Sequence, residues 1–421
     1  MSLVSIISFL ICFGIIASCF RKNADVLSPA RILGFIWSLA VGLADLKLSR
    51  LQDQWTLESW VQLLLGPISL LVGIFVMYVL NIGTRPFQLD KIRQIWRAHS
   101  INHKALFGII LALFALFLSS YITIYLIQGE IPLFSSRPGF ARLNFQMFGL
   151  GLFLHNVALV GFFTVLYLLI VNGNRGKKWL LVLATLSSVV LYSITLQRFQ
   201  VMMTGILSIS LLYYTTRHLR FSTISLWVAC VLLFFYWVST ARGGQLFLYY
   251  LYIDSQMKFS PTYAVFTEPY MYLVMNLENF VRAMERLDHF TYGYYTFDFV
   301  TALTGLKHWI SEYFALEETP YLTSGYNTYS AFWWFYRDYG IIGITIVPFL
   351  LGLSIGLLYY RIRIHPSLQT ISAYCVCVFI MIFSFFNNLV SLLWFIYNLI
   401  AMYFIFRWIQ MKPRLVKILQ K

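Results

Sequence analysis

Charged residues are scarce in this sequence. Asp, Glu, Lys and Arg make up only 11% of the 421 residues, whereas 60% are hydrophobic, and the mean hydropathy is +0.74. An ordinary soluble domain carries about 25% charged residues on its surface. This deficit excludes a water-soluble globular protein and indicates a polytopic membrane protein.

Several signatures of soluble chemistry are also missing. The five cysteines all lie inside apolar runs, so no disulfide framework is predicted. No His-x-x-x-His pair or carboxylate cluster has the spacing of a metal site, and neither a P-loop nor a Gly-x-Ser-x-Gly elbow occurs. We therefore predict no metal and no cofactor, and a nucleotide-driven pump is disfavoured.

Long apolar runs dominate what is present. A helix needs about 20 apolar residues to cross a bilayer. Runs near this length lie at 3–20, 27–45, 59–82, 105–127, 149–171, 179–195, 201–215, 223–240, 340–360, 368–386 and 389–406. The first has no basic segment before it and no small-residue cleavage site, so we predict a retained span. The expected fold is an all-α polytopic membrane protein with about 11 transmembrane helices, forming a single integral-membrane domain over 1–421.

The basic residues are unevenly divided between the two sets of alternating loops. One set holds 20 of the 31 Lys and Arg residues with only Asp25 and Asp90 as acids, and the other holds the remaining 11 basic and 14 acidic residues. By the positive-inside rule the first set faces the cytoplasm. The C-terminus is then cytoplasmic, while the N-terminus and a large loop at 241–338 lie outside. The net charge of +15 thus reflects topology and contact with membrane lipids, not binding of nucleic acid.

The large loop contains a predicted amphipathic helix at 276–287. Its apolar residues recur at helical spacing, and Glu278 and Arg282 are i,i+4 partners. We expect the apolar face to pack on span ends or on the lipid interface. The loop is also crowded with Tyr and Trp, which fit either an interfacial aromatic belt or platforms for stacking sugars.

A set of arginines lies on the predicted outer face, where topology disfavours them. Each is within a few residues of a span end: Arg137, Arg142, Arg198, Arg242 and Arg337. Arg198 has the weakest structural reason, because it occupies a short turn where any small polar residue would serve. Arginine binds phosphate oxygens in a bidentate way and stays protonated. A diphosphate at the membrane surface is therefore a candidate ligand; the alternative is that these side chains snorkel to lipid phosphates.

Three further residues could act as acids or bases. Asp338 precedes an apolar run, where a carboxylate can cap a helix, orient a neighbouring arginine or act as a general base. His289 and Glu278, both in the large loop, are second candidates for the base.

Several short motifs occur in the order seen in a known family. They are Gly129-Glu130-Ile131-Pro132-Leu133-Phe134 followed by Arg142, the lone Arg198, Tyr272 and Asn276 leading to Gly293, Tyr326-Asn327-Thr328-Tyr329, and Tyr336-x-Asp338-Tyr339-Gly340-x-x-Gly343. In this pattern the chain resembles the Wzy-type O-antigen polymerases, although Tyr339 stands where Phe is commoner. The resemblance covers most of the chain.

The resemblance implies a function in the inner membrane of Gram-negative bacteria. Members of the family join undecaprenyl-diphosphate-linked oligosaccharides at the periplasmic face, with a chain-length regulator and a flippase as further partners. Carried over by position, the donor diphosphate would be bound by Arg142, Arg198, Arg242 and Arg337, with Tyr336 and Asn327 lining the site. Arg137 and the two loop residues Glu278 and His289 complete the substrate-binding candidates.

Two other functions stay open on sequence alone. An O-antigen ligase, or another lipid-linked glycosyltransferase, uses the same donor and a similar multi-span body. A flippase or exporter would show ionisable residues or Gly/Pro breaks within several spans. Here the apolar runs are almost free of ionisable residues, with Asp45 and His155 as exceptions and Arg31 near the start of the 27–45 run, which disfavours a transport pathway.

Overall fold

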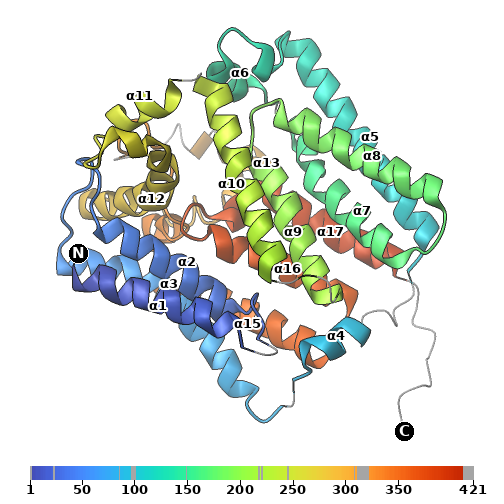
Figure 1. The fold of residues 1–421 in the computed structure, drawn as a ribbon, viewed down its shortest axis with the longest axis horizontal. Coiled ribbons are helices and arrows are strands. Elements are labelled where there is room, and N and C mark those ends of the chain that lie inside the picture. The colour runs from blue at the N-terminus through green and yellow to red at the C-terminus, as the bar shows by residue number, and fades with distance from the viewer. Residues whose placement is uncertain are drawn as a thin grey trace. The chain divides into compact units, whose positions relative to one another are not determined.

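The fold is seen in a computed structural model. It describes residues 2–410 except 22–23, 85, 96–100, 148, 217–218, 220, 244–245, 308 and 311–321. The structure is all-helical (Figure 1). The described residues form no β-strand, and their only β-type pairings are isolated bridges such as Ser49–Met257. The chain divides into two compact units, so the predicted single domain has internal structure. Unit 1 comprises Met1–Pro86, Leu248–Ile364 and Cys377–Ile396; unit 2 comprises Phe87–Phe247, His365–Val376 and Tyr397–Lys421.

Unit 1 is built on four packed apolar helices. α1 packs along α2, α2 contacts α3, and α3 packs extensively on α15 (Figure 1). Its elements are α1 (Leu3–Cys19), α2 (Pro29–Asp45), α3 (Leu57–Leu80), α11 (Phe247–Asp254), η4 (Pro261–Phe266), α12 (Thr267–Arg286), α13 (Asp298–Thr304), α15 (Trp333–Ile364) and η5 (Leu389–Ser391).

Unit 2 has α7 at its centre, in contact with α5, α8 and α9. Its elements are α4 (Leu89–Ile95), α5 (His103–Gln128), η2 (Pro132–Phe134), α6 (Pro138–Asn144), η3 (Leu150–His155), α7 (Asn156–Ile170), α8 (Arg175–Ser193), α9 (Phe199–Thr215) and α10 (Phe221–Gly243). α16 (Leu368–Phe383) and α17 (Leu393–Ile409) have residues in both units, and the first residue of α11, Phe247, belongs to unit 2.

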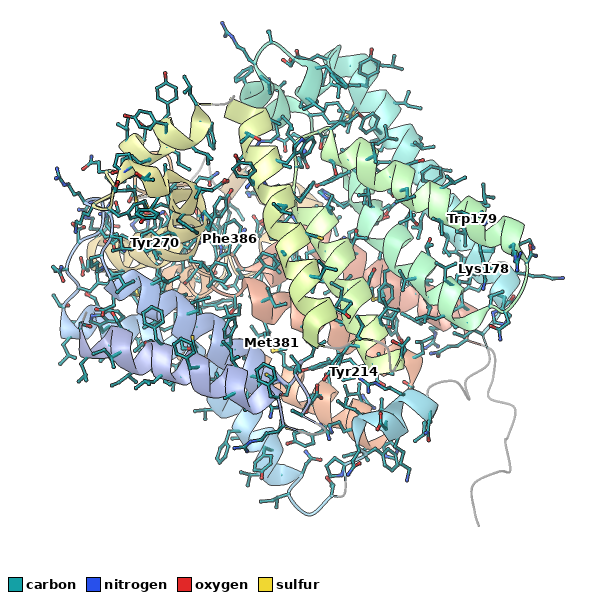
Figure 2. The ribbon with its side chains drawn as sticks, in the orientation of Figure 1. Lys178, Trp179, Tyr214, Tyr270, Met381 and Phe386 are labelled. Carbon is teal, nitrogen blue, oxygen red and sulfur yellow. The ribbon has the colours of Figure 1, made fainter. Side chains whose placement is uncertain are left out.

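Each of the eleven predicted apolar runs coincides with a helix. Four helical segments of the described chain are long and apolar enough to cross a membrane: α3, the segment from α5 to η2, the segment from η3 to α7, and α15; α1, α9, α16 and α17 are shorter apolar helices. Large apolar side chains are exposed on the surface, such as Phe13 (68%) and Phe75 (60%). The exposed Trp179 lies beside Lys178 at the beginning of α8, the pairing expected where a helix meets a lipid interface (Figure 2). These features indicate a membrane-embedded protein.

Glycines bring α3 and α15 into backbone contact. A Cβ at Gly73 would lie 2.2 Å from the carbonyl oxygen of Phe349, and one at Gly352 would lie 2.1 Å from that of Leu70. Small residues at such crossings are typical of helix packing in membranes, where dispersion replaces the hydrophobic effect as the driving force. This crossing holds the part of α15 that follows Gly340 against α3.

α15 is broken near its beginning. Gly340 has φ 62° and ψ −144°, outside the helical region and inaccessible to most side chains. The residues before it, from Trp333, form a short helical segment, and the predicted apolar run begins at the break. Arg337 and Asp338 therefore belong to the short segment and not to the span.

The predicted large loop is mostly helical among its described residues. The amphipathic helix expected at 276–287 is the second half of α12, which begins at Thr267. Its apolar side chains Leu277, Phe280 and Val281 are buried, and α12 contacts α2, α3 and α15. The apolar face thus packs on other helices, the first of the two predicted alternatives.

Candidate functional site

Arg198 is held in the interior of the protein at the start of α9. Its side chain is only 7% exposed, and the residue is the N-cap of that helix. One guanidinium nitrogen, Nη2, donates to the Ser239 hydroxyl of α10. A snorkelling arginine would extend into solvent or lipid. The buried position instead puts a fixed positive charge at the N-terminal end of α9, where the helix dipole also favours an anion.

Arg142 approaches the same turn from α6. The Tyr192 hydroxyl donates to Oε1 of Gln197 (2.9 Å), whose Nε2 donates to the carbonyl of Phe145 (3.3 Å) directly after α6. Arg142 is half-buried and acts electrostatically on the Tyr192 hydroxyl. Unit 2 thus brings two predicted arginines, Arg142 and Arg198, to the turn between α8 and α9.

The other two predicted arginines of unit 2 are placed less completely. Arg137 precedes α6 and is exposed. Arg242 lies in the last turn of α10, which contacts α6, but its side chain is outside the part of the chain that the structure describes.

Arg337 of unit 1 is also an interior arginine. Its side chain is 2% exposed, and its guanidinium carbon lies 4.2 Å from the ring centre of Tyr295 and 5.9 Å from that of Trp333. Stacking of a guanidinium on aromatic faces stabilises its charge in a buried position. Tyr336, the neighbouring residue, is half-buried and packs edge-on against Phe280.

Asp338 is fully buried and binds the segment after α12. Its carboxylate accepts from the Thr291 hydroxyl, from the backbone N–H of Tyr295 (3.2 Å) and from that of Thr296 (2.6 Å). The segment reaches these positions because Tyr292 and Gly293 both have positive φ. Three donors on one carboxylate stabilise a turn and thereby hold Tyr295 under Arg337. The structure therefore gives Asp338 the orienting geometry, one of the roles left open by the sequence.

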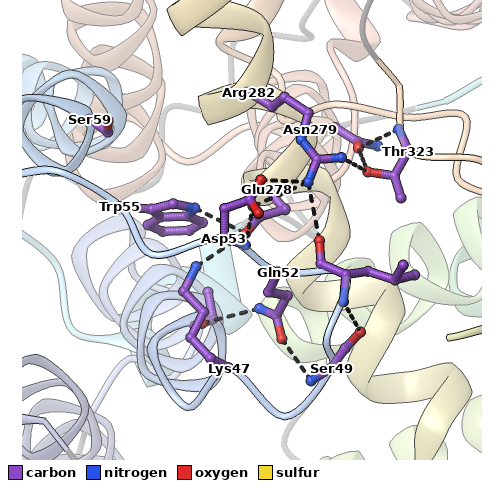
Figure 3. A network of polar contacts seen from close by, with 12 residues as sticks. Lys47, Ser49, Gln52, Asp53, Trp55, Ser59, Glu278, Asn279, Arg282 and Thr323 are labelled. Carbon is purple, nitrogen blue, oxygen red and sulfur yellow. Dashed lines mark hydrogen bonds and ion pairs between the residues drawn. The ribbon is translucent and has the colours of Figure 1, made fainter. Parts of the chain in front are cut away.

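Glu278 is the centre of a buried polar network in unit 1, shown in Figure 3. Its Oε2 accepts from Nζ of Lys47 (3.1 Å) and from Nε1 of Trp55 (2.9 Å), and its Oε1 accepts from the N–H of Asp53 (2.9 Å). Nζ of Lys47 also lies 3.6 Å above the ring of Trp55. The predicted i,i+4 contact with Arg282 is present as a 3.8 Å ion pair.

The network clamps two distant segments onto α12. Arg282 donates to the carbonyl of Leu51 (3.1 Å) and to the Thr323 hydroxyl (2.6 Å). Asn279 accepts from the same hydroxyl (2.9 Å) and donates to the carbonyl of Thr328 (3.0 Å) (Figure 3). Burial raises the pKa of Glu278 and lowers the pKa of Lys47. The positive charge of Lys47 acts to lower the pKa of Glu278, and the negative charge of Glu278 acts to raise the pKa of Lys47, so each charge opposes the effect of burial on its partner. Glu278 is therefore paired with its donors and has a structural role.

The remaining predicted residues, Asn327 and His289, are exposed. Asn327 lies between Tyr326 and Thr328, whose carbonyls both accept from Asn279 of α12. The backbone that carries the Asn327 side chain is therefore fixed. His289 is 62% exposed, and its Nδ1 lies 2.6 Å from Oδ1 of Asp288, whose pKa is lowered by that hydrogen bond.

Sequence reasoning missed Lys47, Thr291 and Asn279. Lys47 follows the second predicted span on the acid-rich face, where a lysine is disfavoured, and that position was the available signal. Thr291 and Asn279 gave no signal, because isolated polar residues in a polar segment are ordinary.

Among the described residues no three His, Cys, Asp or Glu side chains gather as a metal site would require. Comparison with known proteins places the chain in no established group: no family model, no curated protein and no solved structure matches it.

Proposed function

We propose that the protein is a metal-independent glycosyltransferase that polymerises oligosaccharide repeat units carried on undecaprenyl diphosphate. The proposal joins the membrane-embedded helical fold to the interior arginines and to the motif resemblance. The observation that carries it is Arg198, a buried guanidinium at the N-cap of an apolar helix. A lipid-linked diphosphate presents its charge at that depth.

The proposed topology places the chemistry at the periplasmic face of a bacterial inner membrane. It has eleven spans, a periplasmic N-terminus, a cytoplasmic C-terminus and a periplasmic 241–338 segment. The coincidence of all eleven predicted runs with helices supports the number of spans, and the charge imbalance supports the orientation.

The proposed reaction uses a donor that is already activated. The hydroxyl at the non-reducing end of the acceptor repeat unit attacks C1 of the donor glycan, and the C1–O bond to the lipid diphosphate breaks. Arginine side chains stabilise the charge that develops on the departing diphosphate, and burial strengthens this effect. A single displacement inverts the anomeric centre. The acceptor proton passes to a base, and His289 and Glu278 stay candidates beside Asp338.

The test is the substitution of Arg198 in cells that produce the polysaccharide. Arg198→Ala should abolish long glycan while the protein inserts normally, because one charge-assisted contact in a dry site contributes ~3 kcal/mol, roughly a hundredfold in rate. Arg198→Lys should recover only part of the long glycan, since an ammonium group cannot make the paired contacts of a guanidinium. The measurement is the ladder of glycan lengths on a gel.

Arg50 provides the control. It is exposed, follows the second span on the same predicted face, and binds Gln256 through its backbone N–H. Arg50→Ala should leave the ladder intact. Equal ladders for the two alanine variants would remove the reason for placing the diphosphate at Arg198, and polymer that forms but is not transferred to its final acceptor would favour a ligase.

A further inference from the structure

A glutamine lies fully buried and unsatisfied in the core of unit 2. Gln200, in the first turn of α9, has 0% exposure, and neither Nε2 nor Oε1 has a hydrogen-bond partner among the described residues. Its helix face continues through Met203, Thr204 and Leu207, which are all buried. The amide therefore faces the interior of the helix bundle and not lipid.

A second amide faces the same strip. Asn398 of α17 is 1% exposed, and its Nδ2 approaches the sulfur of Met203 at 3.9 Å, while its Oδ1 has no partner in the described chain. Met203 is one turn from Gln200 on the same face. Met203 thus links the two amides, since it lies one turn from Gln200 on α9 and contacts Asn398 of α17. Together they supply one free NH₂ group and two free carbonyl oxygens among the described residues.

Such groups are costly when they have nothing to bind. An unpaired buried amide loses its hydrogen bonds to water without replacement, and an apolar side chain of the same size would pack at lower free energy. Unit 2 pairs its other interior amide fully: Asn156 donates to the carbonyl of Leu113 (3.3 Å) and accepts from the Tyr397 hydroxyl (2.8 Å). The contrast points to a ligand at Gln200 and Asn398.

The donor and acceptor pattern selects the chemical class of that ligand. Phosphate oxygens only accept and a metal cation only binds oxygens, so neither satisfies all three groups. A hydroxyl group both donates and accepts. Gln200 is two residues from Arg198, which is ~3 Å along the axis of α9 and about 200° around it. A ligand that reaches both side chains therefore extends around the first turn of the helix.

We propose that Gln200 and Asn398 bind hydroxyl groups of the donor sugar whose diphosphate is held at Arg198. This inference rests on the proposed function for the identity of the sugar. Gln200 then acts as a specificity-determining residue that positions the glycosyl unit behind its leaving group.

The experiment compares the purified protein with Gln200→Met, a variant of similar size without the amide. Two probes are added in thermal unfolding: inorganic diphosphate, and the glycan released by mild acid from the producing strain's own lipid-linked repeat units. Without probe, Gln200→Met should unfold ~2 °C higher than wild type, because a costly polar group is gone. Glycan should stabilise wild type, with affinity falling about tenfold in the variant. Diphosphate should stabilise both proteins equally.

Asn156→Leu is the matched control, because it removes an interior amide that is paired. It should unfold at a lower temperature and keep the glycan affinity of wild type. Lower stability of Gln200→Met would mean that the amide bonds within the protein and would overturn the proposal. Unchanged glycan affinity would reduce the site to one for trapped water.

The two proposals fail separately. Loss of the diphosphate effect, with the glycan effect and its dependence on Gln200 intact, would contradict the role of Arg198 and leave the hydroxyl site standing. The reverse pattern would contradict the hydroxyl site alone.

Discussion

Two buried polar regions of this protein differ in how completely their groups are paired. In unit 1, Glu278 receives hydrogen bonds from Lys47, Trp55 and Asp53, and Arg282 and Asn279 bind the segments around them. In unit 2, Gln200 is just as buried, and its side-chain amide has no partner among the described residues. A polar interior by itself does not mark a binding site. The paired region ties segments together, and the unpaired one is where a ligand can contribute free energy.

The largest expected effect comes from breaking the paired region. Glu278→Leu leaves the Lys47 ammonium buried without its carboxylate, which should cost ~3–5 kcal/mol of stability. The unfolding temperature in detergent measures this loss. The double variant Lys47→Met, Glu278→Leu should regain much of it, because an apolar pair replaces the ion pair. Equal destabilisation in the single and double variants would show that the cost lies elsewhere in the network.

A smaller effect is expected at Asp338, whose buried carboxylate, like that of Glu278, accepts hydrogen bonds from several donors. Asp338→Asn replaces one accepting oxygen by an NH₂ group facing backbone donors, so stability should fall by about 2 kcal/mol. Glycan polymerisation should fall with it, since Tyr295 loses its fixed place beside Arg337. Thr291→Val should show both effects more weakly. A normal unfolding temperature together with lost polymerisation in Asp338→Asn would instead identify a general base.

The smallest effect concerns Tyr270, whose hydroxyl accepts from the N–H of Leu48 (2.9 Å) and donates to Gln52 (2.7 Å). Burial raises its pKa to about 12. The unfolded tyrosine ionises near pH 10, so between pH 10 and 12 only the unfolded state loses the proton. Stability should therefore fall as pH rises, by about 1.4 kcal/mol per pH unit from this group. The free energy of unfolding of Tyr270→Phe, measured between pH 9 and 11, should lack this pH-dependent contribution. An identical dependence of the free energy on pH in both proteins would contradict the prediction.

Local sequence pattern predicted the helices well and the polar partners poorly. Hydropathy located the long apolar helices, because lipid-facing and core-facing helices both require apolar runs, but it missed short helices such as α6 and α13. The break in α15 at Gly340 was not predicted, although the apolar run begins at that residue. Pairing between Lys47 and Glu278 could not be read, because it depends on how α12 packs on α2. Gln200 was hidden because it lies just before the apolar run at 201–215, where a polar side chain is ordinary.

The Lys47–Glu278 pair has a consequence for how the chain is made. Its members are 231 residues apart, so the first three helices leave the ribosome long before α12 exists. At 5–20 residues per second the delay is roughly 10–50 s. During that time Lys47 has no carboxylate from α12, and α3 lacks α15. Assembly of unit 1 therefore waits for the last third of the chain, and nascent chains that end before α12 should be the ones that membrane quality control removes.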